Sequence, residues 1–264
     1  MDLKIQGKRA LVTGSTAGIG FAIAARLAAE GASVIVNGRT QPRVEAAIRQ
    51  LSSGNSGADV QGFAGDLSKP EAVQELTSRW PDLDILVNNA GIFEPRPFAE
   101  ITDEEWTNMW EVNVMSGVRL SRHYLSRMLA AGWGRILFIS SESAVQTPAE
   151  MIHYGVTKTA QLAVSRGMAE LTSGTAVTVN SVLPGPTRSE GVSQFVKQLA
   201  AQQNIDEAGF EKIFFEKARP SSLLKRFETP EEIADMVAFL ASPLSSGTNG
   251  AAVHVDGGCV RSIL

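Results

Sequence analysis

The sequence predicts a doubly wound α/β fold built on a parallel sheet. Short apolar runs alternate along the chain with amphipathic stretches of helical period, and alternating β and α units favour a sheet with helices on both faces. The runs are nearly continuous in apolar residues, which is typical of strands covered on both sides. A glycine-rich turn follows the first run directly, as it does where such folds bind nucleotides.

Each element follows from this pattern, in chain order. The runs expected as strands are Arg9–Val12, Ser33–Asn37, Val60–Ala64, Ile85–Asn88, Arg135–Ser140, Thr175–Val182 and Ala252–Val255. The stretches expected as helices are Ile19–Glu30, Arg43–Leu51, Pro70–Arg79, Asp103–Ala131, Ile152–Ser173 and Pro230–Ala241. Two of them have clear start signals. Thr102 precedes Glu105 by three residues, a capping-box spacing, and Thr229 precedes Pro230 at a first helical position.

Composition limits the function classes. The 264 residues are 44% hydrophobic, and no linker or repeat divides them, so we expect a single domain over residues 1–264. A net charge of −4 gives no basic surface for nucleic acid. The start has no secretory signal and no apolar run could cross a membrane, so a cytoplasmic location is expected. Cys259 is the only cysteine and three histidines are scattered, so no metal site is expected.

Residues 187–226 interrupt the alternation. This segment leaves the carboxyl end of the sixth predicted strand and contains two weaker amphipathic pieces, Val192–Ala201 and Phe210–Lys217. Such connections often form lids over a binding site, so we predict a substrate lid within the domain. A variable surface insertion is an equal alternative.

The segment LVTGSTAGIG joins the first strand to the first helix. Its glycines, Gly14, Gly18 and Gly20, would permit a tight turn and bring backbone N–H groups close to a pyrophosphate at the helix N-terminus. The hydroxyls of Ser15 and Thr16 would add contacts. A plain strand-to-helix turn also uses glycine, but the position between strand and helix favours dinucleotide binding.

The end of the second strand indicates which dinucleotide is bound. A carboxylate there would favour NAD and repel a 2′-phosphate, whereas this chain has Gly38 followed by Arg39. Because a guanidinium can bind a phosphate through two hydrogen bonds, we expect NADP(H) rather than NAD(H). The alternative is an ordinary solvated arginine.

Tyr154 and Lys158 stand four residues apart. On a helix this spacing puts both side chains on one face, with Cβ atoms about 5–6 Å apart. A nearby ammonium stabilises phenolate and lowers the pKa of the tyrosine. Taken alone, the pair is better explained by chance on a solvated helix face, so the rest of the chain must decide.

Together these segments resemble the short-chain dehydrogenases/reductases of the single-domain type, over nearly the whole chain. The landmarks in order are TGSTAGIG (Thr13–Gly20), GDL (Gly65–Leu67), NNAG (Asn88–Gly91), Asn113, ISS (Ile139–Ser141), YGVTK (Tyr154–Lys158), PGPT (Pro184–Thr187) and VDGG (Val255–Gly258). The resemblance implies a Rossmann-like parallel sheet of about seven strands and a nicotinamide cofactor.

The same resemblance implies four catalytic residues. Tyr154 would exchange a proton with the carbonyl oxygen, and Lys158 would lower its pKa and bind the nicotinamide ribose. Ser141 would hold the substrate oxygen. Asn113 would support a water that links Lys158 to solvent, and a bend at this mid-helix asparagine is a compatible second explanation.

The resemblance also implies contacts to the cofactor outside the glycine turn. These would come from Ile19, Asp66, Leu67, Asn89, Ala90, Gly91, Pro184, Gly185 and Thr187, together with Tyr154 and Lys158. Asp66 and Leu67 would lie near the adenine, Asn89–Gly91 near the adenosine, and the PGPT segment at the nicotinamide. Glu142, directly after Ser141, would either contact a polar or cationic substrate, or form a salt bridge or face solvent, and the last two are favoured.

We therefore expect an NADP(H)-dependent oxidoreductase that reduces a carbonyl or oxidises a secondary alcohol. A non-catalytic dinucleotide-binding regulator on the same fold is the alternative from a different class, and the intact set of four catalytic residues favours the enzyme. By resemblance we expect a homotetramer, with a dimer next. The sequence does not separate sugar, steroid, thioester and small ketone substrates.

Overall fold

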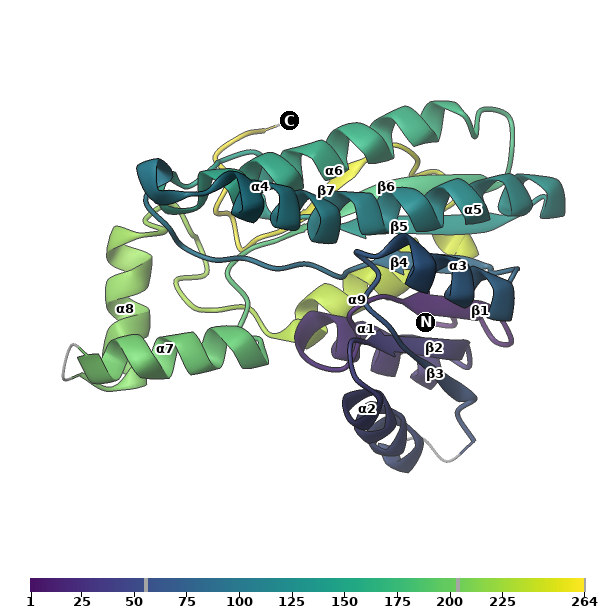
Figure 1. The fold of residues 1–264 in the computed structure, drawn as a ribbon, viewed down its shortest axis with the longest axis horizontal. Coiled ribbons are helices and arrows are strands. Elements are labelled where there is room, and N and C mark those ends of the chain that lie inside the picture. Colours follow the sequence, from purple (N-terminus) through teal and green to yellow (C-terminus); the bar gives the residue numbers. More distant parts are fainter. Residues whose placement is uncertain (55–56, 203–204, 264) are drawn as a thin grey trace.

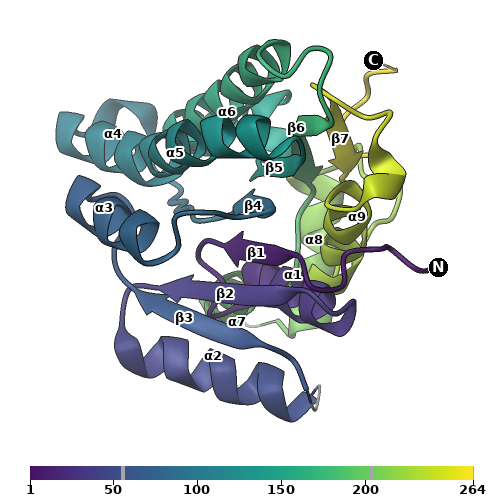
Figure 2. The same ribbon diagram turned by 90° about the vertical axis from the view of Figure 1, so that its right-hand side faces the viewer.

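Seven parallel strands form a single sheet in the computed structural model, which describes residues 1–54, 57–202 and 205–263. The strand order is β3-β2-β1-β4-β5-β6-β7 (Figures 1 and 2). The strands are β1 (Arg9–Val12), β2 (Ser33–Gly38), β3 (Val60–Ala64), β4 (Ile85–Asn88), β5 (Gly134–Ile139), β6 (Val177–Pro184) and β7 (Ala252–Val255). The α/β fold and the seven-stranded parallel sheet that the sequence predicts are confirmed.

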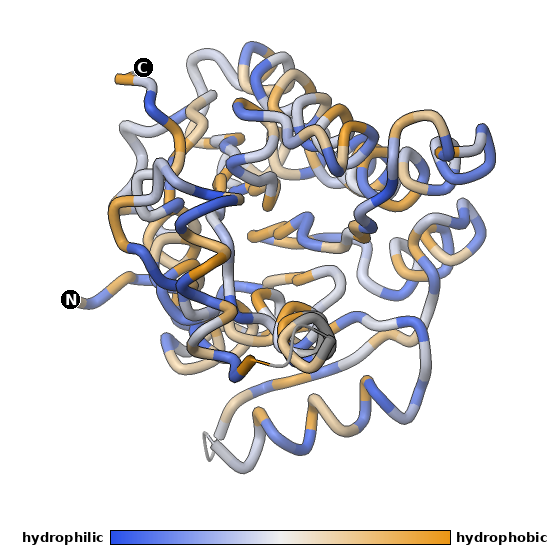
Figure 3. The backbone as a smooth tube through the Cα atoms, turned by 90° about the vertical axis from the view of Figure 1, so that its left-hand side faces the viewer, coloured by the Kyte–Doolittle hydropathy of each residue, from blue (hydrophilic) through white to orange (hydrophobic). Residues whose placement is uncertain are grey.

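Helices cover both faces of this sheet. They are α1 (Gly18–Ala29), α2 (Gln41–Gly54), α3 (Pro70–Arg79), α4 (Asp103–Trp110), α5 (Ser116–Ala131), α6 (Ile152–Glu170), α7 (Glu190–Gln202), α8 (Glu207–Lys217) and α9 (Pro230–Leu240). Successive strand residues point to opposite faces. Ala10 and Val12 therefore pack in a core with α1, α2 and α9, while Leu11 packs in a second core with α3, α5 and α6. Figure 3 shows hydrophobic and hydrophilic residues alternating along the helices, as expected where one side of each is buried.

Two of the differences from the predicted elements have a clear cause in the structure. The sixth strand begins at Val177 rather than Thr175, because the Thr175 hydroxyl and N–H both bond to Thr172 O in a turn. The predicted helix Asp103–Ala131 is divided into α4 and α5 by a π-helical turn at Glu111–Met115. Such turns are rare and are frequent at functional sites.

The two predicted helix starts are confirmed. Thr102 and Glu105 form a full capping box at α4, in which the Thr102 hydroxyl accepts from the Glu105 N–H and the Glu105 carboxylate accepts from the Thr102 N–H. Thr229 and Glu232 do the same at α9. These bonds satisfy N–H groups that the first helical turn leaves free.

The segment 187–226 contains α7 and α8, which stand to one side of the sheet in Figure 1. Their apolar residues Val196, Ala200, Phe210 and Phe215 form a small core together with Phe227, which directly follows the segment. Residues 203–204 of this segment lie outside the described residues. The two helices are longer at their N-termini than the predicted pieces.

The chain order of the strands reverses between β1 and β4. Crevices at such a switch point, outside the carboxyl ends of the strands, are where doubly wound sheets bind ligands. The predicted glycine turn, NNAG, ISS and PGPT segments all leave strands at this edge. Across the described ranges, no helix has both the length and the apolar character needed to span a membrane.

Candidate active site

A cavity of about 420 Å³ lies at the carboxyl ends of the strands. Its wall includes three of the four predicted catalytic residues, Ser141, Tyr154 and Lys158. Predicted cofactor residues that also line it are Ile19, Asn89, Gly91, Pro184, Gly185 and Thr187. The fold thus gathers these predicted residues from five separate segments of the chain around one space.

The glycine turn is shaped for a ligand with negative charge. Gly14 and Gly18 have φ angles of 62° and 56°, a region that favours glycine. At Gly20 a Cβ atom would lie 2.4 Å from Asn89 Nδ2, so a side chain cannot fit. No side chain caps the first turn of α1, which leaves its N–H groups for an anion. The turn therefore fits the pyrophosphate of a dinucleotide.

Ser15 does not offer the hydroxyl contact that the sequence suggested. It is fully buried, its hydroxyl donates to Val12 O at 2.6 Å, and it accepts from the Asn37 N–H at 2.9 Å. Its own N–H donates to Asn37 O. The prediction for this hydroxyl is wrong because the connection between β1 and β2 uses it. Thr16, by contrast, is partly exposed.

Thr13 holds the glycine turn against the segment after β4. Its hydroxyl accepts from the N–H groups of Asn89 and Ala90, both at 2.9 Å. The Asn89 amide in turn donates to the carbonyls of Thr13 and Gly14. Asn89 and Ala90 therefore set the geometry of the turn, a role that Thr13, as part of TGSTAGIG, could have signalled.

The outer cofactor residues are placed differently from one another. Arg39 is exposed directly after β2, and no hydrogen bond or ion pair joins it to another residue that the structure describes. Asp66 is exposed, and its carboxylate accepts from the Ser68 N–H. The Leu67 side chain is buried in the second core, so a cofactor contact of Leu67 would have to come from its backbone.

Ser141 and Tyr154 meet at the cavity wall. Ser141 follows β5, its hydroxyl accepts from the Ser143 N–H at 3.1 Å, and it donates to Glu142 Oε2 at 2.5 Å. Tyr154 stands in the first turn of α6 and lies on the same cavity wall. Phe93 packs edge-on to the Tyr154 ring with centroids 6.3 Å apart. A serine and a phenol that share one wall can hold a single substrate oxygen.

Lys158 lies one turn further along α6. Its ammonium is 5.5 Å from the centroid of the Tyr154 ring and donates to Ile139 O at 2.9 Å. A further contact, 3.4 Å long, goes to Gln161 Oε1, and the Gln161 amide donates to Asn113 O at 2.5 Å. Gln161 thus bridges Lys158 to Asn113, where the family resemblance suggested a water.

The π-helical turn explains the position of Asn113. Its side chain donates to Ile92 O and to the Thr157 hydroxyl, both at 3.0 Å, and accepts from the Ile92 N–H at 2.8 Å. Asn113 is 1% exposed. The helix irregularity at Asn113 is this π-helical turn, and the Asn113 side chain ties the segment after β4 to α6.

The expected lowering of the Tyr154 pKa is not found. Burial raises the pKa of Tyr154 above its ordinary value, and the charge of Glu142 raises it further. Burial also lowers the pKa of Lys158 to about 8. Desolvation is the largest cause of both shifts, because each group is buried and burial disfavours its charged form. At neutral pH the phenol carries its proton and the lysine is mostly charged.

Glu142 forms a buried ion pair rather than facing solvent. Its Oε1 accepts from Arg219 Nε at 3.0 Å. Arg219, which follows α8, also reaches Glu150 at 3.3 Å. The salt bridge that the sequence allowed for Glu142 is therefore present, and it joins the residue beside Ser141 to the end of the 187–226 segment.

The PGPT segment is held by another buried carboxylate. Glu228 is 3% exposed, and its Oε2 accepts from the Gly185 N–H at 3.0 Å. The Thr187 hydroxyl donates to Gly185 O at 2.9 Å, which leaves its lone pairs free to accept. Gly185 and Thr187 therefore face the cavity on a backbone that Glu228 fixes.

We expect Glu228→Gln to change how stability depends on pH. Burial raises the pKa of Glu228 from 4.5 to about 7. The folded chain therefore binds this proton more tightly than the unfolded chain, and the stability present below pH 4.5 is lost as pH rises to about 7. Glutamine keeps an acceptor for Gly185 without the charge. The Tm of the wild type should fall relative to the variant across this range, by circular dichroism, and parallel curves would contradict the assignment.

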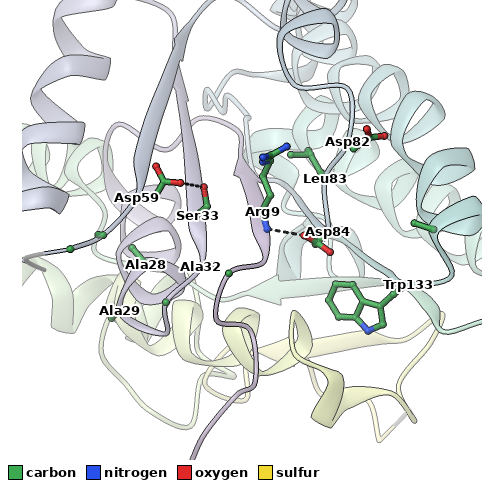
Figure 4. Close-up of a pocket in the computed structure, with 15 residues that line it drawn as sticks. Arg9, Ala28, Ala29, Ala32, Ser33, Asp59, Asp82, Leu83, Asp84 and Trp133 are labelled. Atoms are coloured by element: carbon green, nitrogen blue, oxygen red, sulfur yellow. Dashed lines mark hydrogen bonds between the residues drawn. The ribbon is translucent and has the colours of Figure 1, made fainter.

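A second, larger cavity lies at the amino ends of the strands, on the side of the sheet away from the candidate active site. Its volume is about 710 Å³, and Figure 4 shows Arg9, Ser33 and Asp84 around it, near the amino ends of the strands. The Asp84 carboxylate accepts from the Arg9 N–H and from Lys8, and Asp59 accepts from the Ser33 hydroxyl. These polar groups bond to one another, and none of the predicted site residues lies here.

Comparison with known families agrees with this geometry. The family model described as enoyl-(acyl carrier protein) reductase matches residues 14–260. That range holds the glycine turn and all four predicted catalytic residues. The chain belongs to the short-chain dehydrogenase/reductase family. It is an oxidoreductase of the kind that acts on CH–OH groups.

Similar proteins span the full length of this short-chain dehydrogenase/reductase. The uncharacterized oxidoreductase YvaG of Bacillus subtilis is 50% identical over 263 residues, with complete coverage of both chains. The 3-oxoacyl-[acyl-carrier-protein] reductase FabG of Aquifex aeolicus is 31% identical, covering 98% of this chain and 99% of its own. L-Sorbose reductase from Gluconobacter frateurii, solved with NADPH and L-sorbose, is 34% identical with a TM-score of 0.93 and complete coverage of both chains.

Three residues of this short-chain dehydrogenase/reductase site were missed from the sequence. Gln161 stands three residues after Lys158, a spacing that puts both on one helix face, so it had a signal. Arg219 and Glu228 had none, because each reaches its partner from a distant part of the chain. Only the folded chain brings Arg219 to Glu142.

Proposed function

We propose that the chain is an NADP(H)-dependent oxidoreductase that reduces a carbonyl, or oxidises a secondary alcohol, with Tyr154 as the general acid or base. The observation that carries this proposal is the arrangement of Ser141, Tyr154 and Lys158 on the wall of a cavity that Ile19, next to a glycine turn fitted to a pyrophosphate, also lines. A regulator that only binds dinucleotide would not need a protonated phenol beside a serine hydroxyl in that cavity.

The chemistry follows from the positions of these groups. The carbonyl carbon receives a hydride that the reduced nicotinamide supplies when bound, and the carbonyl oxygen takes the phenolic proton of Tyr154, which gives an alcohol and the oxidised cofactor. The Ser141 hydroxyl holds the same oxygen as its charge develops. Lys158 stabilises the phenolate that remains. Asn113 and Gln161 hold Lys158 in place through the 2.5 Å and 3.4 Å contacts.

The cofactor assignment to NADP(H) is supported by Arg39 and by Gly38. Arg39 is exposed and has no partner among the described residues, so its guanidinium is available to a 2′-phosphate. A Cβ at Gly38 would lie 2.4 Å from Thr16 Cγ2, which disfavours a carboxylate at the position where NAD-binding sites hold one. The similar L-sorbose reductase, whose structure was solved with NADPH, supports the same choice of cofactor.

Arg39→Ala is expected to weaken the binding of NADPH without affecting the binding of NADH. Loss of a charge-assisted pair should raise the KM for NADPH by about 10- to 100-fold, and the KM for NADH should stay within about twofold. Arg49→Ala removes a guanidinium that is 71% exposed and pairs only loosely with Glu45, so it serves as the control. Equal losses for both cofactors would contradict the role of Arg39.

We also propose that residues 187–226 act as a lid. The cavity is lined by four residues of this segment, Val192, Val196, Phe210 and Phe214, so movement of the segment would open or close the site.

We further propose that the chain forms a homotetramer. The family resemblance and exposed apolar residues on α6, such as Val156, support self-association. Sedimentation at micromolar protein would test the tetramer.

A panel of ketones, aldehydes and alcohols tests the proposed function. Purified protein with NADPH should consume the cofactor, followed at the nicotinamide absorbance, when a suitable carbonyl is added, and the same protein with NADP⁺ should oxidise the matching alcohol. Cofactor binding without turnover of any member of the panel would favour the regulator.

A further inference from the structure

The polar end of the cavity is built around Glu142. This residue is 5% exposed, and both of its carboxylate oxygens have partners. Oε2 accepts from the Ser141 hydroxyl at 2.5 Å, and Oε1 accepts from Arg219 Nε at 3.0 Å. The Ser141 proton, which the proposed function directs to the substrate oxygen, is therefore donated to Glu142 before substrate arrives.

The charges around the cavity disfavour an anionic substrate. Among the described residues that line it, the charged ones are Glu142, Glu150, Lys158 and Arg219. Arg219 is shared between two carboxylates, and Lys158 is held by Ile139 and Gln161. A substrate carboxylate would therefore find no free cation on this wall and would meet the charge of Glu142.

A plain ketone also fits this end poorly. Its oxygen only accepts hydrogen bonds, so it would take the Ser141 proton and leave Oε2 of a buried carboxylate without a donor. Buried acceptors left without a partner weaken binding strongly. A substrate with a hydroxyl on the carbon next to the carbonyl avoids this loss, because that hydroxyl replaces Ser141 as the donor to Glu142.

We propose that Glu142, fixed by Arg219, selects neutral carbonyl substrates that carry a hydroxyl on the neighbouring carbon, and vicinal diols in the reverse direction. This inference rests on the proposed function, since it concerns the same cavity and the same Ser141 hydroxyl. Glu142 acts here as a specificity-determining residue. The remaining wall, with Phe93, Met151 and Phe214, takes the apolar part of the substrate.

The test compares three four-carbon ketones with NADPH. These are 3-hydroxybutan-2-one, butan-2-one and the anion 3-oxobutanoate. For the wild type, kcat/KM should be about tenfold or more higher for the hydroxyketone than for butan-2-one, and lowest for the anion. A preference for the hydroxyketone below about threefold overturns the inference.

Glu142→Gln should remove the preference. Arg219 holds the amide oxygen as it holds Oε1, which turns the amide NH₂ toward Ser141 and the substrate and leaves no acceptor there. The ratio of kcat/KM between hydroxyketone and butan-2-one should fall at least about fivefold, and 3-oxobutanoate should improve. Glu207→Gln, which removes a lid carboxylate that pairs with Arg188 outside the cavity wall, should keep the wild-type ratio.

The failures of the two proposals are distinguishable. Turnover of all three ketones with a ratio that Glu142→Gln leaves unchanged, while NADPH still quenches the protein fluorescence, overturns the role of Glu142 alone. No turnover of any carbonyl by the wild type counts against the proposed function instead. If Glu142→Gln does not bind NADPH, the double variant Glu142→Gln/Arg219→Gln replaces it, because it leaves no unpaired buried charge. The ratio of kcat/KM between the hydroxyketone and butan-2-one is then measured on the double variant and decides the role of Glu142.

Discussion

Tyr154→Phe is expected to lower kcat/KM for carbonyl reduction by about 10³-fold, within the range that general acid catalysis contributes. The phenol is protonated at neutral pH because burial raises its pKa, so it is ready to donate. Phenylalanine keeps the ring that Phe93 and Lys158 contact and removes only the proton donor. NADPH binding, measured by fluorescence, should therefore remain close to the wild type.

The second tyrosine of the chain provides a matched control. Tyr124 belongs to α5 and packs in the second core, where its hydroxyl donates to Trp80 O at 2.8 Å, outside the cavity wall. Tyr124→Phe should leave kcat/KM unchanged and reduce the free energy of unfolding by about 1 kcal/mol. Retained turnover in Tyr154→Phe, or equal losses in both variants, would show that the Tyr154 hydroxyl is not the proton donor.

Lys158→Met is expected to lower kcat/KM by about 10²-fold or more, because the phenolate formed in the reaction loses its neighbouring charge. The same substitution should change stability with a definite pH dependence. Burial lowers the pKa of Lys158 from 10.5 to about 8, so the unfolded chain binds this proton more tightly. Wild-type stability should therefore rise relative to the variant as pH increases from about 8 to about 10.5.

Thermal melts of both proteins across this pH range check the stability effect, and steady-state kinetics check the activity. Lys8→Met is the control, since Lys8 pairs with Asp84 at the opposite edge of the sheet, and it should leave kcat/KM unchanged. A Tm difference between wild type and Lys158→Met that does not vary with pH would contradict the burial of a charged Lys158.

Some site residues could be predicted because their signals are local. The four-residue spacing of Tyr154 and Lys158 lies within one helix, and the glycines of the first turn lie within seven residues of chain. Ser15 shows the limit of such reasoning. Its type suits a phosphate contact, but its hydroxyl is used by Val12 and Asn37, and only the pairing of β1 with β2 places Asn37 there.

The direction of the pKa shift of Tyr154 also could not be predicted from the sequence. Spacing indicated that a lysine faces a tyrosine, which taken alone lowers the pKa of the phenol. Whether this attraction or desolvation dominates depends on how much apolar protein surrounds both groups. The folded chain buries them together and adds Glu142 nearby, and these effects raise the pKa of Tyr154.

The sequence by itself determined the α/β fold, the order of its elements, the family and the four residues of the proposed catalytic set, because periodicity, capping and short motifs are properties of neighbouring residues. The tertiary structure decided which polar groups remain available to ligands, how Gln161 bridges Lys158 to Asn113, and that Arg219 holds Glu142 beside Ser141. The decisive contacts join residues far apart in the chain, such as Glu142 and Arg219, whose residue numbers differ by 77. The sequence does not indicate which distant residues will meet, because these contacts form only when the sheet and its helices pack together.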